Sequence, residues 1–207
     1  MRRVPVLATI VVALAVAAMI GLGLWQLTVR LPEKEAYIAQ LRANPALPPI
    51  AFPLQPDDSL LFRRTSAMCL EPVSITRAGA GKAGFRLIAT CRTGAEGPGV
   101  KIQLGTTHDP NFTAKWTGGR VSGWISHAPS SAPLIAGLFG GTAPQEMLLV
   151  ADRPAPGLAA NTQPTADLVP NNHLSYAVQW FFFAAIALVI YAVALRARVR
   201  AQASGRG

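Results

Sequence analysis

The sequence predicts an α+β membrane protein in which two transmembrane helices flank a mostly antiparallel β domain. No charged residue occurs from Val4 to Leu27, and none occurs from Leu174 to Leu195. At about 1.5 Å of rise per residue, each run reaches roughly 30 Å as a helix, which is enough to cross the hydrocarbon. Between the runs, short apolar segments alternate with turns rich in glycine and proline, which is typical of β-strands.

The first apolar run has two interpretations. Arg2 and Arg3 precede it, as basic residues precede the core of a signal peptide. However, the core is longer than a typical signal, and the residues after it, Trp25 and Gln26, do not form a small-residue cleavage site. We therefore expect an uncleaved helix over residues 4–29, with a second transmembrane helix over residues 173–195.

Charge predicts the orientation of the two helices. The tails, residues 1–3 and 196–207, contain arginine but no acidic residue. Basic residues in short flanking segments stay in the cytoplasm and contact anionic lipid, so both termini are expected there. Arginine outnumbers lysine, and alanine and glycine are abundant, which fits a bacterial inner membrane with a periplasmic central domain. The central segment is nearly balanced in charge, which argues against nucleic-acid binding.

The central segment is expected to contain three parts. Residues 30–59 would hold a short helix, from Glu33 to Arg42 with Pro32 in its first turn, and then a proline-rich extended strap. Residues 60–154 would form the β domain, and residues 155–172 a linker to the second helix. The candidate strands are Ser66–Ile75, Gly84–Arg92, Val100–Leu104, Arg120–Ile125 and Met147–Ala151, which would form an antiparallel sheet or open barrel.

Cys69 and Cys91 are the two cysteines of the chain, and each lies in a candidate strand. On the oxidising side of a membrane a disulfide between them is favoured over two buried thiols. A metal site is disfavoured, because the chain has no CxxC motif and His108 and His127 lack ligand spacing.

Motifs of common enzymes are absent from the sequence. It contains no P-loop, no GxSxG elbow and no HExxH. The ten acidic residues also leave few carboxylates for acid–base chemistry. We therefore expect a protein that is not an enzyme.

The start of the second apolar run carries a stripe of ring-bearing side chains. His173, Tyr176, Trp180 and Phe183 follow one another at helical spacing, which places them on one face. Aromatic residues are common anchors at membrane interfaces, so the stripe alone favours anchoring. The alternative is a haem site, in which the imidazole ligates iron and the flat rings line the macrocycle.

The end of the first apolar run holds Gly23, Trp25 and Gln26. Glycine permits close contact between helices, and a glutamine near the membrane boundary can hydrogen-bond a partner helix. We expect these residues to pack against the second helix.

Two sequence motifs at these helix ends resemble the surfeit locus protein 1 family. The first is LGLWQL, residues 22–27, followed by Arg30, Leu31 and Lys34, and the second is NNHLSYAVQW, residues 171–180. The resemblance implies two helices around a soluble domain, and a role in the assembly of cytochrome c oxidase. It further implies association with haem a and with the largest subunit of the oxidase, and extends to the enzymes that synthesise haem a.

This resemblance, together with the stripe, makes His173 the candidate axial ligand of haem iron and makes Tyr176 and Trp180 the candidate pocket walls. The chain departs from the family pattern in three places. It is one residue longer between Trp25 and Arg30, it has Pro32 where an aromatic is common, and residues 121–125 only faintly match the family's central strand. The alternatives are a scaffold that binds no haem, and a sensor or transport subunit.

Overall fold

A computed structural model describes residues 5–94, 99–130 and 144–204. The chain forms two compact units, of which we call Met1–Tyr37 with Pro170–Gly207 the helical unit and Ile38–Val169 the β unit. The arginines at positions 2, 3 and 206, on which part of the predicted orientation rests, lie outside the described residues.

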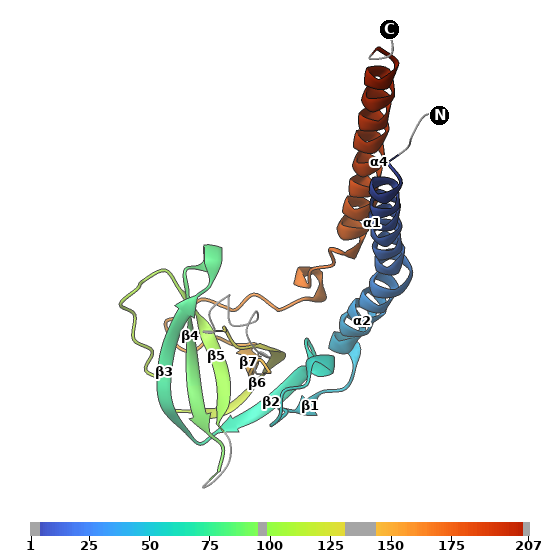
Figure 1. The fold of residues 1–207 in the computed structure, drawn as a ribbon. Helices are drawn as coiled ribbons and strands as arrows, with labels where there is room; N and C mark the ends of the chain where they lie inside the picture. Colours follow the sequence, from blue (N-terminus) through green and yellow to red (C-terminus); the bar gives the residue numbers. More distant parts are fainter. Residues whose placement is uncertain (1–4, 95–98, 131–143, 205–207) are drawn as a thin grey trace. The chain divides into compact units, whose positions relative to one another are not determined.

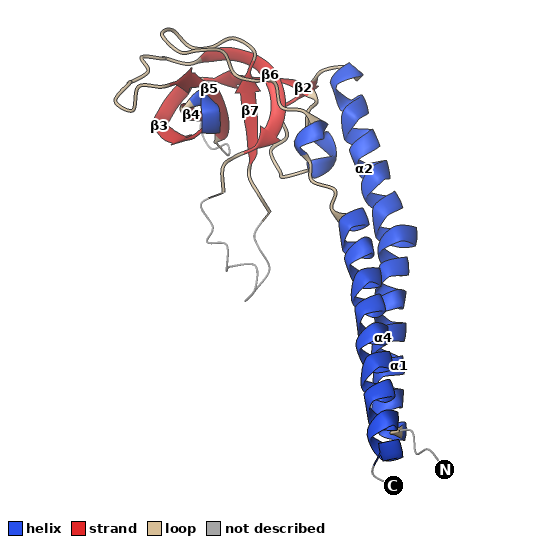
Figure 2. Cartoon of the chain, turned by 90° about the horizontal axis from the view of Figure 1, so that it is seen from above, coloured by secondary structure: helices blue, strands red, loops and turns tan. Residues whose placement is uncertain are grey.

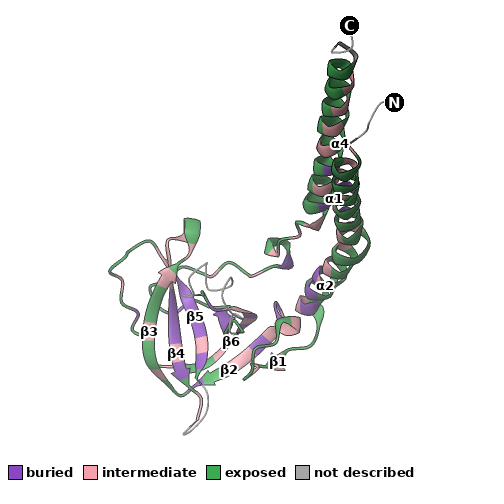
Figure 3. Cartoon of the chain, viewed as in Figure 1, coloured by how far each residue is buried: buried purple, intermediate pink, exposed green. Residues whose placement is uncertain are grey.

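The helical unit contains two long helices. Helix α1 spans Val6–Trp25 and helix α4 spans His173–Ser204 (Figure 1). Both are long and apolar enough to cross a membrane. Most of their side chains are exposed, including large aliphatic and aromatic ones (Figure 3). Exposed apolar side chains in this number fit a membrane protein, because lipid would cover them.

The two helices run antiparallel and are joined by hydrogen bonds between side chains near both ends. The hydroxyls of Thr9 and Tyr191 share one bond, and Gln26 accepts the other from His173. Between them, the buried residues Val16 and Gly23 of α1 lie seven positions apart, as do Ala177 and Ala184 of α4. A seven-residue repeat of buried positions is the pattern of closely packed helix pairs.

The helical backbone continues beyond the end of α1 at Trp25. It passes through a π-helical turn, Gln26–Arg30, directly into helix α2, Leu31–Ala43. The expected short helix, Glu33–Arg42 with Pro32 in its first turn, lies within α2, and it follows α1 without a break in the helical backbone. The reason is local: the backbone N–H of Leu31 donates to the carbonyl of Gln26, so the wider turn carries the helix up to a proline that has no N–H of its own.

The β unit is built on one seven-stranded sheet with the order β1-β2-β6-β7-β5-β4-β3 (Figure 1). Four neighbouring pairs are antiparallel, whereas β1 with β2 and β5 with β7 are parallel, so the sheet is mixed. The strands are β1 (Ile50–Ala51), β2 (Arg64–Cys69), β3 (Glu71–Gly79), β4 (Phe85–Arg92), β5 (Val100–Thr107), β6 (Gly119–His127) and β7 (Met147–Ala151).

Strand β7 lies at the centre of the sheet, and all five of its residues are buried. Its sequence is a continuous apolar run, as expected of a strand covered on both faces. Strands β4 and β5 are also largely buried, whereas the edge strand β3 is mostly exposed (Figure 3). The core of the β unit therefore lies against the middle of the sheet.

A disulfide joins Cys69 of β2 to Cys91 of β4, with Cα atoms 5.2 Å apart. Three strands separate β2 from β4 in the sheet order. In a flat sheet, strands four positions apart would lie about 19 Å from one another. The sheet is therefore strongly curled, in the manner of an open barrel (Figure 2), and the disulfide joins two strands that are not neighbours in the sheet order.

The bounds expected for one strand of this unit are wrong. The segment Ser66–Ile75 is not one strand, because the chain leaves β2 at Cys69 and starts β3 at Glu71, which pairs with β4 instead of β6. The single residue between the two strands, Leu70, is exposed, and its N–H donates to the carbonyl of Arg92 in β4.

The expected linker 155–172 is in part a component of the β unit. Ala155 and Leu158 are buried in the core, and Ala159 forms a β-bridge with Thr106. Strand β7 pairs with β5 only from Lys101 to Gln103, so the chain after β7 supplies hydrogen bonds to the remainder of β5. The Asn161 side chain completes this contact with hydrogen bonds to Gln103 and to the carbonyl of Ala151.

Candidate functional site

The end of the helix pair where α4 begins brings together two residues of the sequence motifs. The Nδ1 atom of His173, the first residue of α4, lies 2.7 Å from Oε1 of Gln26, the first residue of the π turn. Both side chains are half-buried. The two residues are 147 positions apart in the sequence, so only the antiparallel packing of the helices makes this contact possible.

Gly23 allows the helices to approach closely at this end. It is buried, and a Cβ atom at its position would lie 2.7 Å from the ring of Phe181. Gly21, two residues earlier, faces open space. Trp25 does not face α4 in the same way: it is largely exposed, and the guanidinium of Arg30 lies 5.7 Å from its ring centre. A cation at this distance from an indole face is attracted to it.

The aromatic stripe of α4 is divided between two environments. Trp180 is half-buried, and its ring meets that of Phe183 edge to face at 6.3 Å between centroids. Tyr176 is 49% exposed, while Ala177 beside it is fully buried. The buried stripe of α4 thus runs through His173, Ala177 and Ala184, and Tyr176 lies at its margin.

A single histidine, His173, is the candidate metal donor at this end. Within the described residues, no group of three or more histidine, cysteine, aspartate or glutamate side chains is placed to hold a metal. A haem supplies four nitrogen ligands of its own, so the protein needs to add only an axial ligand such as histidine. The described contacts of His173 involve Nδ1 alone, which leaves Nε2 for such a role.

Comparison with protein families covers both the helices and the β unit. A model of the SURF1 family matches residues 13–185 in one continuous range. The chain belongs to the SURF1 family. No curated protein is similar enough to this chain to serve as a relative. SURF1 proteins are assembly factors of cytochrome oxidase and are not a family of catalysts.

The SURF1 match also includes the middle of the chain, where the short motifs show little resemblance. By short motifs, the resemblance concentrates at the two helix ends, but the family match runs through the β unit as well. The divergence at residues 121–125 is therefore a local difference within a SURF1 domain. In this chain Gly123 lies against β7, where a Cβ atom would be only 2.0 Å from the carbonyl oxygen of Val150.

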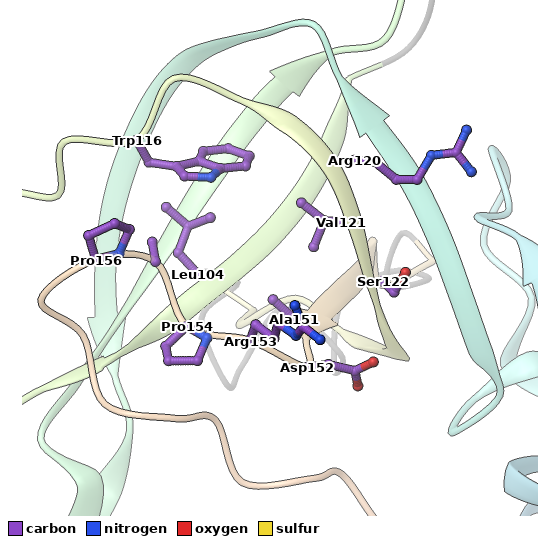
Figure 4. A pocket seen from close by; sticks show the side chains of 11 residues that line it. Leu104, Trp116, Arg120, Val121, Ser122, Ala151, Asp152, Arg153, Pro154 and Pro156 are labelled. Atoms are coloured by element: carbon purple, nitrogen blue, oxygen red, sulfur yellow. The ribbon is translucent and has the colours of Figure 1, made fainter.

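The β unit also has a cavity of about 470 Å³ beside β6 and the segment that follows β7 (Figure 4). Its lining is mainly apolar, and the indole of Trp116 lies over Leu104. Asp152 at its edge forms an ion pair with Arg64 at 2.7 Å, and the guanidinium of Arg120 points away from Trp116. Sequence motifs do not indicate this cavity, because its lining combines residues of β5, β6 and β7 with Trp116 and the segment 152–156.

Two further polar contacts lie near the start of β2. Nε2 of His127, the last residue of β6, lies 2.7 Å from a carboxylate oxygen of Asp58. The carboxylate of Asp57 accepts hydrogen bonds from the hydroxyl and the backbone N–H of Ser59, and these bonds lower the pKa of Asp57 below its usual value of 3.8.

Proposed function

We propose that this protein assists the assembly of a terminal haem–copper oxidase in the bacterial inner membrane by holding haem a, or the largest oxidase subunit while haem a is inserted. Membership of the SURF1 family supports the assembly role. The observation that carries the haem role is the position of His173, whose imidazole is fixed on one side by Gln26 and has no other described hydrogen bond. His173 is the axial ligand in this proposal.

Trp180 and Tyr176 are proposed as walls of the haem site. Trp180 packs edge to face on Phe183, which limits the orientations of its ring. Tyr176 is exposed beside the ligand, so its ring is free to cover one face of a bound macrocycle. Bound haem would supply the redox-active iron, and these side chains would orient it and exclude water.

The membrane boundary is a suitable depth for such a site. In the proposed orientation both termini are cytoplasmic and the β unit is periplasmic, so Gln26 and His173 lie at the periplasmic surface. Haem a is apolar and can reach this depth from the bilayer without an aqueous path. The partners would be the largest oxidase subunit and the enzymes that synthesise haem a.

An alternative function is a scaffold that stabilises an oxidase intermediate without binding haem. One row of exposed residues along α4 favours it: large apolar side chains recur at helical spacing, namely Val178, Phe182, Ile186, Val189 and Val193. Such a row suits contact with lipid or with the transmembrane helix of a partner. A sensor or transport subunit is a further alternative, and it predicts normal oxidase levels in a deletion strain.

The deciding experiment compares His173→Ala with His108→Ala. Both proteins would be purified from cells that make haem a, and their visible spectra and the level of assembled oxidase would be measured. We expect His173→Ala to insert normally but to lose or shift the haem band and to lower oxidase levels, while His108→Ala behaves as the native protein. A native spectrum in His173→Ala would remove the axial role.

The orientation is tested separately with reporter fusions. A fusion at residue 207 and a fusion near residue 110 are expected to report opposite sides of the membrane. Reports from the same side would contradict the arrangement with two spanning helices.

A further inference from the structure

We propose that Gln26 is a positioning residue that fixes the tautomer of His173, so that Nδ1 carries the proton and Nε2 presents its lone pair. The inference starts from one contact, the 2.7 Å approach of Nδ1 of His173 to Oε1 of Gln26. A carboxamide oxygen can only accept a hydrogen bond, so the hydrogen in this bond belongs to Nδ1. In a neutral imidazole the other nitrogen then has no hydrogen.

This arrangement is the one that a metal-binding histidine requires. Histidines that ligate metals generally donate their second ring N–H to an oxygen, which orients the ring and raises the basicity of the ligating nitrogen. Gln26 supplies that oxygen from a different helix, so the orientation of the ring depends on the packing of α1 against α4. Without such an acceptor, the proton is free to move to Nε2 and block it.

The backbone at Gln26 shows how its side chain is held in place. Gln26 begins the π turn, and its carbonyl accepts from the N–H of Leu31, five residues later. A π turn of this kind accommodates one residue more than an α-helical turn, and such turns recur at functional sites. Gln26 lies three residues after the buried Gly23 and ten after the buried Val16, on the side of the helix that faces α4.

The identity of the ligand, haem, rests on the proposed function, but the tautomer can be measured without any haem. The full-length protein would be prepared in lipid nanodiscs with ¹⁵N-labelled histidine. The chain has three histidines, so His173→Ala identifies the signals of the residue in question. Two-bond ¹⁵N–¹H correlations, recorded at about pH 8, distinguish a proton on Nδ1 from a proton on Nε2.

Two variants separate positioning from packing. Gln26→Glu keeps an acceptor oxygen, whereas Gln26→Met keeps the length and volume of the side chain without a strong acceptor. We expect the Nδ1–H form of His173 in the native protein and in Gln26→Glu, and its loss in Gln26→Met. An Nε2–H form in the native protein, or an unchanged tautomer in Gln26→Met, would overturn the inference.

Titration with haemin provides the second measurement. We expect Gln26→Met to bind haemin about 10- to 100-fold more weakly than the native protein, the loss that removal of such a hydrogen-bond partner typically causes. Gln26→Glu should bind haemin and lower its reduction potential, because a carboxylate makes the ligand more basic. An Nδ1–H tautomer without any haemin spectrum would support the positioning bond and remove the haem proposal. Binding of haemin by a protein with the His173 proton on Nε2 would support the haem proposal and overturn the positioning bond.

Discussion

The two units of the chain differ in what holds their elements together. In the β unit, seven strands share backbone hydrogen bonds, a buried apolar core lies against them, and a disulfide links two strands that are distant in the sheet. In the helical unit, each long helix satisfies its own backbone, and the described contacts between α1 and α4 are small buried residues with hydrogen bonds at Thr9–Tyr191 and Gln26–His173.

This difference fits water around the β unit and lipid around the helical unit. The β unit removes its apolar residues from water by folding, so it carries its own source of stability. The helical unit leaves most of its apolar residues exposed, and a bilayer gives no hydrophobic gain for pairing two helices. Polar contacts and close approach at small residues then determine how α1 and α4 align. Changes in one unit should therefore have consequences that differ in kind from changes in the other.

The largest effect is expected from removal of the disulfide. Replacing both Cys69 and Cys91 with alanine removes a covalent link across 22 residues, which in the chain-entropy model is worth about 3 kcal/mol. We expect the melting temperature of the β unit to fall by roughly 10 °C, as followed by near-ultraviolet circular dichroism. Reduction of the native protein should reproduce the change. Equal stability of the oxidised and reduced proteins would show that the curled sheet does not need the bond.

A second change tests the close approach of β6 to β7. Gly123→Ala places a Cβ atom 2.0 Å from the Val150 carbonyl oxygen, and backbone cannot move aside as a flexible side chain can. We expect a loss of about 1–3 kcal/mol in the free energy of unfolding, measured with denaturant. Gly79→Ala is the matched control, because nothing lies within 4 Å of that position. Equal effects from the two substitutions would contradict the packing described here.

In the helical unit, the corresponding test is at Gly23. Gly23→Ala brings a methyl group to 2.7 Å from the ring of Phe181, whereas Gly21→Ala enters open space. Because a ring can rotate away more easily than backbone, we expect a smaller loss, on the order of 1 kcal/mol. Thermal unfolding in detergent, followed by far-ultraviolet circular dichroism, measures it. An unchanged melting temperature of the β unit in Gly23→Ala would support separate sources of stability in the two units. A loss of stability in both units would contradict them.

The smallest effect is a pH dependence from Asp57. Hydrogen bonds from Ser59 lower the pKa of Asp57 in the folded protein, so its contribution to stability is complete above 3.8, its usual pKa. The contribution is lost as the pH falls further, through the lowered pKa. Asp57→Asn keeps an acceptor for both bonds but does not titrate, so it should flatten this part of the stability curve. Identical curves of stability against pH for the native protein and Asp57→Asn would show that Asp57 does not contribute to the loss of stability in acid.

The features that could be predicted from the sequence are those with a local cause. The two helices follow from uninterrupted apolar runs, and β7 follows from the apolar run Met147–Ala151, which has the predicted bounds. Pairing of Cys69 with Cys91 is favoured because they are the two cysteines of the chain and each lies in a candidate strand on the expected oxidising side. The information that decides the helices and β7 lies within a few consecutive residues. For the disulfide, two cysteines allow only one pairing.

The features that the sequence could not reveal depend on distant partners. Nothing at Leu70 indicates that the strand before it joins β6 and the strand after it joins β4. The contact of Asn161 with Gln103 and Ala151 depends on where β7 stops pairing with β5. At the candidate site, spacing placed Tyr176 in one stripe with His173, but the buried side chain one helical turn after His173 is that of Ala177. The bond between His173 and Gln26 depends on the register of two helices, which neither helix specifies alone.

The bridge between β2 and β4 has a mechanical consequence. A pulling force applied to the two ends of the chain would unroll an open barrel strand by strand, but it cannot extend the segment enclosed by Cys69 and Cys91. An oxidised molecule should therefore stretch to a contour about 7 nm shorter than a reduced one, because the 22 enclosed peptide units would each contribute about 0.34 nm. While the bond is intact, a force transmitted along the chain passes through the disulfide, so that β3 and most of β4 are protected from extension.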